Sequence, residues 1–283
     1  MDNKQRREEE KRRTIREMCI MDDPFMNAVF NDNIDAANLM LRIILDNPSI
    51  SVKSVTVQKR LPNIYGHDVI LDIHAFDGKT MFDCEVPNAR KGADPQRARY
   101  HVGLMDMSSL PEGENYDKLP ESYVIFITEK DYFRRGSAVY SFNRYDEKHM
   151  MGLQDGSHIL YVNGSYRGDD RLGKLMHDFR CTNAEDMNYN ELRDRARHLK
   201  ETEEGGMTMS RTFDRMMEEE RREGFFEGRV EGREEGREEG RAFEARRMDR
   251  LISELLTQNR LEDLKKATSD TGFKENLFKE FSI

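Results

Sequence analysis

The sequence has few cysteines. Only three occur in 283 residues: Cys19, Cys84 and Cys181. An odd number of widely separated cysteines argues against a disulfide framework and against a zinc cluster built on cysteine. A reducing, cytoplasmic environment is therefore expected.

Long apolar runs are also missing. The run from 123 to 128 is far shorter than the ~20 residues that cross a bilayer. The first thirteen residues, MDNKQRREEEKRR, have no apolar stretch behind a basic start. We therefore expect no membrane span and no export through the secretory pathway.

A net positive charge is absent as well. The chain has 46 basic and 55 acidic residues, a formal net charge of −9. This balance excludes a wholly basic nucleic-acid binder, so any contact with DNA would come from a local basic patch.

Four segments differ in composition. Residues 1–18 are almost all polar and are expected to form a frayed helix or a disordered arm. Residues 19–206 have the patterns of a folded domain, residues 207–250 form a glycine and charge repeat, and residues 251–283 are expected to form short helices. The length alone suggests about two domains, or one large domain with an appendage.

Within 19–206, helical spacing predicts helices after Asp22-Asp23-Pro24 and over 36–45. Apolar patterning then predicts strands over 51–61, 67–77, 80–86, 122–128, 138–142 and 158–164. A helix opened by Asp94-Pro95 is expected between the third and fourth strands, and another over 187–203. This mixture predicts an α/β or α+β domain ending near Gly205-Gly206.

Glycine recurs at every fourth position of the repeat segment, at Gly224, Gly228, Gly232, Gly236 and Gly240. On a helix these glycines form one row, and at about 1 kcal/mol each they cost roughly 5 kcal/mol relative to alanine. Two interpretations stay open. The segment is either a solvated charged tether or a helical arm whose glycine row lets two chains pack closely as a homo-oligomer.

A short turn sets the register of two strands that carry acidic residues. If Gly78-Lys79 form a two-residue type II′ loop, Asp77 pairs with Thr80. Asp72 then lies directly opposite Glu85, and the two-residue period of a strand puts His74 and Asp83 on the same face.

Carboxylates in this arrangement repel each other unless a cation lies between them. Mg²⁺ prefers oxygen ligands and is often held by one or two carboxylates. The flanking apolar residues of VILDI and FDCEV indicate buried strands, where a carboxylate needs a partner. The sequence therefore predicts a metal site at Asp72 and Glu85. The alternative is an ordinary acidic pair on the exposed face of a hairpin.

An ordered series of motifs covers residues 22–205: LDIHAFDGKTMFDCEV, RARYH, LPESYVIFIT, DGSHILYVNG and LGKLMHDFRCT. The series resembles the transposase-like branch of the PD-(D/E)xK nuclease superfamily, which includes the recombination-promoting nucleases. The resemblance implies a restriction-endonuclease-like mixed sheet flanked by helices, followed by a charged helical C-terminal arm. It also implies cleavage of DNA with Mg²⁺ or Mn²⁺ as cofactor.

By this resemblance, Asp72 matches the first metal-binding aspartate and Glu85 the second acidic ligand. The backbone carbonyl of Val86 is implied as a further ligand. Arg97 and Arg99 match an RARYY-type motif that is expected to hold DNA phosphates. Their alternative is a solvated helix face.

The third motif position departs from the family. There the family has lysine, or in this branch usually glutamine, but this chain has Pro87. Proline has no polar side chain to orient water or to stabilise charge. Either catalysis is weakened, or Lys91 or Arg90 takes the role. Arg90 and Lys91 are also expected to extend the DNA-binding basic cluster.

Other residues are expected to be structural. Tyr100 is interpreted as a packing residue, and His177 of the LMHDF motif as a hydrogen-bonded structural histidine. Cys181 does not complete a zinc set.

Metal-dependent DNA cleavage is the leading functional hypothesis. A DNA-binding or regulatory protein of the same fold with weakened catalysis is the alternative, because of Pro87. An oligomeric scaffold built by the charged tail is a third.

Overall fold

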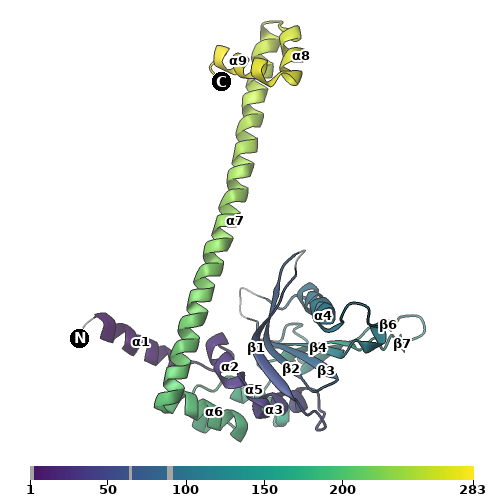
Figure 1. Cartoon of the computed structure of the whole chain (residues 1–283), viewed down its shortest axis with the longest axis vertical. Helices are drawn as coiled ribbons and strands as arrows, with labels where there is room; N and C mark the ends of the chain where they lie inside the picture. Colours follow the sequence, from purple (N-terminus) through teal and green to yellow (C-terminus); the bar gives the residue numbers. More distant parts are fainter. Residues whose placement is uncertain (1–2, 64–65, 88–91) are drawn as a thin grey trace. The chain divides into compact units, whose positions relative to one another are not determined.

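The computed structural model of the chain, drawn in Figure 1, describes residues 3–63, 66–87 and 92–283. The chain divides into two compact units, Met1–Met216 and Met217–Ile283. The first unit begins earlier and ends later than the 19–206 segment expected from composition.

A six-stranded mixed sheet forms the centre of the first unit, with the strand order β1-β2-β3-β4-β8-β5. The strands are β1 Ser54–Leu61, β2 Val69–Phe76, β3 Thr80–Glu85, β4 Glu121–Thr128, β5 Val139–Phe142 and β8 Ser157–Asn163. β3–β4 and β4–β8 are parallel, and the other neighbours are antiparallel. A separate small hairpin joins β6 Tyr145–Asp146 to β7 Met151–Gly152. All six predicted strands are present.

Helices cover both faces of this sheet. The helices before residue 203 are α1 Asn3–Glu17, α2 Asp23–Phe30, α3 Ile34–Ile44, α4 Pro95–Ser109, α5 Arg171–Asp178 and α6 Asn190–Glu201, with short 3-10 turns at η1 Tyr116–Lys118 and η2 Ala184–Asp186. α4 forms the crossover between the parallel strands β3 and β4 and packs on one face (Figure 1). α2, α3, α5 and α6 share the core of the other face. The expected α/β class, a mixed sheet flanked by helices, is confirmed.

The β2–β3 turn forms as the sequence predicts. Gly78 has a φ of 104°, which glycine adopts without steric cost. The Asp77 N–H donates to the Thr80 carbonyl at 3.3 Å and closes the turn. Ile73 pairs with Cys84 and His74 with Asp83, so the predicted register is confirmed.

The charged N-terminal segment forms the helix α1, and Ile15 near its end is buried. Of the two states expected for residues 1–18, the structure therefore shows the helix over the part that it describes.

Gly205 and Gly206, where the end of the domain is expected, both lie inside α7, Glu203–Thr257. The break between α6 and α7 lies at Thr202, whose hydroxyl accepts from the Gly205 N–H at 3.0 Å. A Cβ at Gly205 would lie 2.0 Å from the His198 carbonyl oxygen, so glycine is needed for close contact rather than for a linker.

In the second unit, the remainder of α7 is followed by α8, Leu261–Ser269, and α9, Thr271–Glu280. These helices share a small core of Leu251, Leu255, Ala267, Leu277 and Phe278. The repeat glycines Gly224 to Gly240 are exposed, and a Cβ on any of them would meet no described atom within 4 Å. In the part of the chain that the structure describes, no helix has the length and apolar character needed to cross a bilayer.

Candidate functional site

Three carboxylates and one imidazole gather where β2 and β3 lie beneath α4. Asp72 comes from β2, Asp83 and Glu85 from β3, and His101 from α4, and all four are buried. Asp83 and Glu85 share a face because alternate residues of a strand do. One ligand atom from each of Asp83, Glu85 and His101 lies within 4.8 Å of the others.

Asp72 and Glu85 lie together, as the register predicts, and backbone groups hold both side chains. The Asp72 N–H donates to Glu85 Oε1 at 2.8 Å. The Val86 N–H donates to Asp72 Oδ2 at 3.2 Å. Val86 therefore contributes to the site through its N–H.

Arg97 enters this site from the first turn of α4. Its guanidinium donates to Glu85 Oε2 and, at 2.8 Å, to the Gly92 carbonyl. The Arg97 side chain is only 21 % exposed. The structure thus places Arg97 against a buried carboxylate, whereas Arg99 is exposed on the same helix. Arg90 and Lys91 lie outside the described residues.

His101 is a site residue that the sequence analysis did not identify. Its Nδ1 lies 2.8 Å from Asp83 Oδ2 and 4.0 Å from Glu85 Oε1. His101 follows Arg97 by four residues, so one face of α4 carries both side chains. The spacing of Arg97 and His101 within RARYH, on a helix that begins at Pro95, is the sequence signal that could have identified His101.

Burial raises the pKa values of two of these carboxyl groups. Burial raises the pKa of Asp83 to about 8, and the charge of Asp72 adds to this effect. Burial and the charges of Asp83 and Asp72 also raise the pKa of Glu85 well above its usual range, although His101 and Arg97 oppose this shift. Asp83 Oδ1 is buried without a hydrogen-bond partner among the described residues.

These residues fit a divalent cation. Carboxylate oxygens suit Mg²⁺ and Mn²⁺, and imidazole is a common ligand of transition metals. A cation among Asp83, Glu85 and His101, whose ligand atoms lie within 4.8 Å of one another, would supply positive charge to the buried carboxylates and would give Asp83 Oδ1 a partner. Asp72 lies outside this group and meets Glu85 through its backbone N–H.

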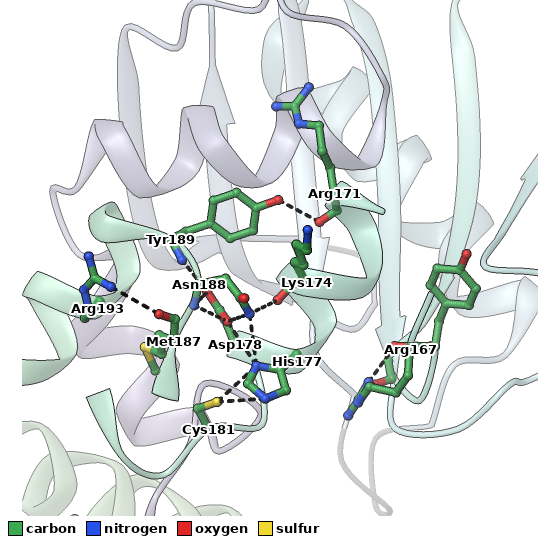
Figure 2. A network of polar contacts seen from close by, with 12 residues as sticks. Arg167, Arg171, Lys174, His177, Asp178, Cys181, Met187, Asn188, Tyr189 and Arg193 are labelled. Atoms are coloured by element: carbon green, nitrogen blue, oxygen red, sulfur yellow. Dashed lines mark hydrogen bonds and ion pairs between the residues drawn. The ribbon is translucent and has the colours of Figure 1, made fainter. Parts of the chain in front are cut away.

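A second polar cluster lies at the end of α5 (Figure 2). Asp178 accepts the N–H groups of Asn188 and Tyr189 at 2.8 to 2.9 Å, and the Asn188 side chain at 2.7 Å. His177 Nδ1 lies 3.4 Å from Cys181 Sγ within the same network. Burial, followed by the charge of Asp178, raises the pKa of Cys181 to about 11, which disfavours the thiolate that binds metals.

Because backbone donors occupy the oxygens of Asp178, this cluster fastens the loop that precedes α6. The LMHDF motif therefore has a structural explanation, in which His177 is one of the hydrogen-bonded members.

Tyr100 and Pro87 flank the site. The Tyr100 hydroxyl donates to the His67 carbonyl at 2.6 Å and accepts from Asn63 at 2.7 Å, which ties α4 to the β1–β2 connection. Pro87 is half-buried and follows the end of β3 by two residues.

Comparisons with protein-family models, with curated proteins and with solved structures give no match to this chain.

Proposed function

We propose that the chain is a metal-dependent DNA endonuclease of the transposase-like, recombination-promoting kind. The observation that carries this proposal is the group of buried carboxylates Asp72, Asp83 and Glu85, in which Asp83 Oδ1 has no hydrogen-bond partner among the described residues. The motif resemblance supports it, because a restriction-endonuclease-like core has acidic ligands on neighbouring strands of a mixed sheet.

In this proposal, Asp72, Asp83 and Glu85 hold Mg²⁺ or Mn²⁺, and His101 is a further ligand or orients Asp83. A bound divalent cation supplies a Lewis acid for the phosphate and lowers the pKa of a water molecule. Arg97 offsets part of the negative charge and keeps Glu85 oriented through its ion pair. The Asp72 N–H of β2 holds Glu85, and the Val86 N–H just after β3 holds Asp72.

DNA would approach from the α4 side. Arg99 is exposed on that helix and would contact phosphate. Arg90 and Lys91 remain predicted members of this basic cluster.

Nicking of supercoiled plasmid DNA with Mg²⁺, with Mn²⁺ and with EDTA tests the proposal. We expect the full chain to cut only with a divalent cation, and Asp72→Asn or Glu85→Gln to lower the rate by more than about 100-fold. Glu112→Gln, at an exposed acidic residue outside the site, is the matched control. Full activity in both site variants, or no cleavage by the parent with either cation, contradicts the proposal.

A DNA-binding or regulatory protein with weakened catalysis is the second candidate. Pro87 favours it, because it leaves the end of β3 without the polar group of the family motif. On this candidate, the parent and Asp72→Asn bind DNA equally well in Ca²⁺ or EDTA, and neither cuts it. Cleavage by the parent alone rejects it.

A further inference from the structure

Gln58 has an unusual backbone conformation inside a strand. Its φ is 51°, in the left-handed region that side chains other than glycine rarely adopt. The antiparallel pairing of β1 and β2 continues on both sides of it, from Val57 with Ile73 to Lys59 with Leu71. This conformation costs free energy, and such strain is typical of functional sites.

The side chain of Gln58 reaches the acidic site. Its Nε2 donates to Asp72 Oδ1 at 3.2 Å, while the Val86 N–H holds Asp72 Oδ2 at 3.2 Å. The two oxygens of this carboxylate are therefore held from opposite neighbours, by a side chain of β1 and by the backbone just after β3. Such a pair of donors fixes the plane of the carboxylate.

At this point of the β1–β2 hairpin, the apolar residues also change the core against which they pack. Val55 of β1 and Ile73 of β2 belong to the core with α2 and α3. Leu61 of β1 and Leu71 of β2 belong to the core with α4, although an uninterrupted strand would keep all four on one face. The change falls between these residues, at Gln58 and Asp72. Local distortions of this kind re-aim side chains next to active sites.

We propose that Gln58 is a positioning residue of the metal site and acts on Asp72. Its amide holds the Asp72 carboxylate in the orientation in which Asp72 shares a divalent cation with Glu85. This inference rests on the proposed function. Gln58 thus brings a polar amide from β1 to the acidic pair. Pro87, in the segment after β3, has no polar side chain to offer there.

Titration of the full, metal-free chain with Mn²⁺ alone tests this role by calorimetry. Gln58→Gly removes the amide and suits the left-handed φ, so we expect it to fold at least as stably as the parent. Gln58→Met removes the amide at nearly constant volume. Loss of a group that orients a metal ligand typically lowers affinity 10- to 100-fold, so we expect Mn²⁺ affinity to fall by about this factor in both variants.

Gln154→Gly is the matched control. Gln154 has a φ of 54°, is exposed and lies in the loop before β8, so the same substitution tests the backbone effect alone. We expect it to leave Mn²⁺ affinity unchanged. Plasmid cleavage is measured in parallel, and kcat should fall in the Gln58 variants even at saturating Mn²⁺.

The outcomes separate this inference from the function on which it rests. Unchanged Mn²⁺ affinity and kcat in either Gln58 variant, with a parent that binds Mn²⁺ and cuts, overturn the role of Gln58 alone. A parent that neither binds Mn²⁺ nor cuts overturns the proposed function and the role of Gln58 with it.

Discussion

Arg97 forms an ion pair with Glu85, and the Glu85 side chain is fully buried. Removing one partner of a buried pair leaves an uncompensated charge, which costs about 3 kcal/mol or more. We therefore predict that Arg97→Ala lowers the free energy of unfolding by roughly 3 kcal/mol in urea denaturation without metal. Saturating Mn²⁺ should restore part of this loss, because the cation then faces Glu85.

Arg99→Ala is the control for this variant. Arg99 is exposed on the same helix, so its loss should change the free energy of unfolding by less than about 0.5 kcal/mol. In DNA binding, we expect Arg99→Ala to lower the slope of log affinity against log salt concentration by roughly one. Equal stability of the Arg97 and Arg99 variants would show that the ion pair with Glu85 contributes little.

Asp83 predicts a pH dependence of the metal-free protein. Burial raises its pKa to about 8 in the folded chain, against the ordinary 3.8 of an aspartate in an unfolded chain. Between these values the folded state binds more protons than the unfolded state, so the free energy of unfolding should fall as pH rises from about 4 to about 8. Asp83→Asn should flatten this slope in urea denaturation across that range. Parallel slopes for parent and variant would contradict it.

The β2–β3 hairpin shows how a single element sets the site. Gly78 has a φ of 104°, and the turn that it forms sets the register in which β2 pairs with β3. We predict that Gly78→Ala costs about 1 kcal/mol or more, measured by thermal unfolding, because alanine is strained at positive φ.

Gly103→Ala provides a control of opposite sign. Gly103 is exposed within α4, and a Cβ there would meet no described atom within 4 Å. Alanine should stabilise this helix by roughly 0.5 to 1 kcal/mol. A similar loss of stability in both glycine variants would show that positive φ is not the cause at Gly78.

At the scale of the whole molecule, the glycine row of α7 is the feature that bears on assembly. Within one chain nothing described requires glycine at Gly224, Gly228, Gly232, Gly236 or Gly240. We predict that the parent forms homo-oligomers through this row, and that replacing all five glycines by alanine weakens association in sedimentation experiments.

The same substitution should increase helicity, because each glycine costs about 1 kcal/mol in a helix. A synthetic peptide of residues 218–247 should accordingly be mostly unfolded alone, and its alanine counterpart more helical by circular dichroism. An unchanged oligomeric state in the full-length alanine variant would favour the charged tether.

The sequence by itself determined the features that depend on local interactions. Period-two patterning located the strands, Asp94-Pro95 located the start of α4, and the Gly78 turn placed Asp72 beside Glu85. These predictions succeeded because a two-residue loop fixes the register through contacts between near neighbours in the chain.

The tertiary structure alone decided what else surrounds Glu85 and where the domain ends. His101 and Arg97 reach the site because the crossover between β3 and β4 lays α4 over these strands. Gln58 faces Asp72 because the β1–β2 hairpin changes the core against which it packs. Gly205 lies within a helix because α7 packs against the end of α6. Each of these depends on which surfaces the folded chain buries against one another, and no local pattern of residues encodes that choice.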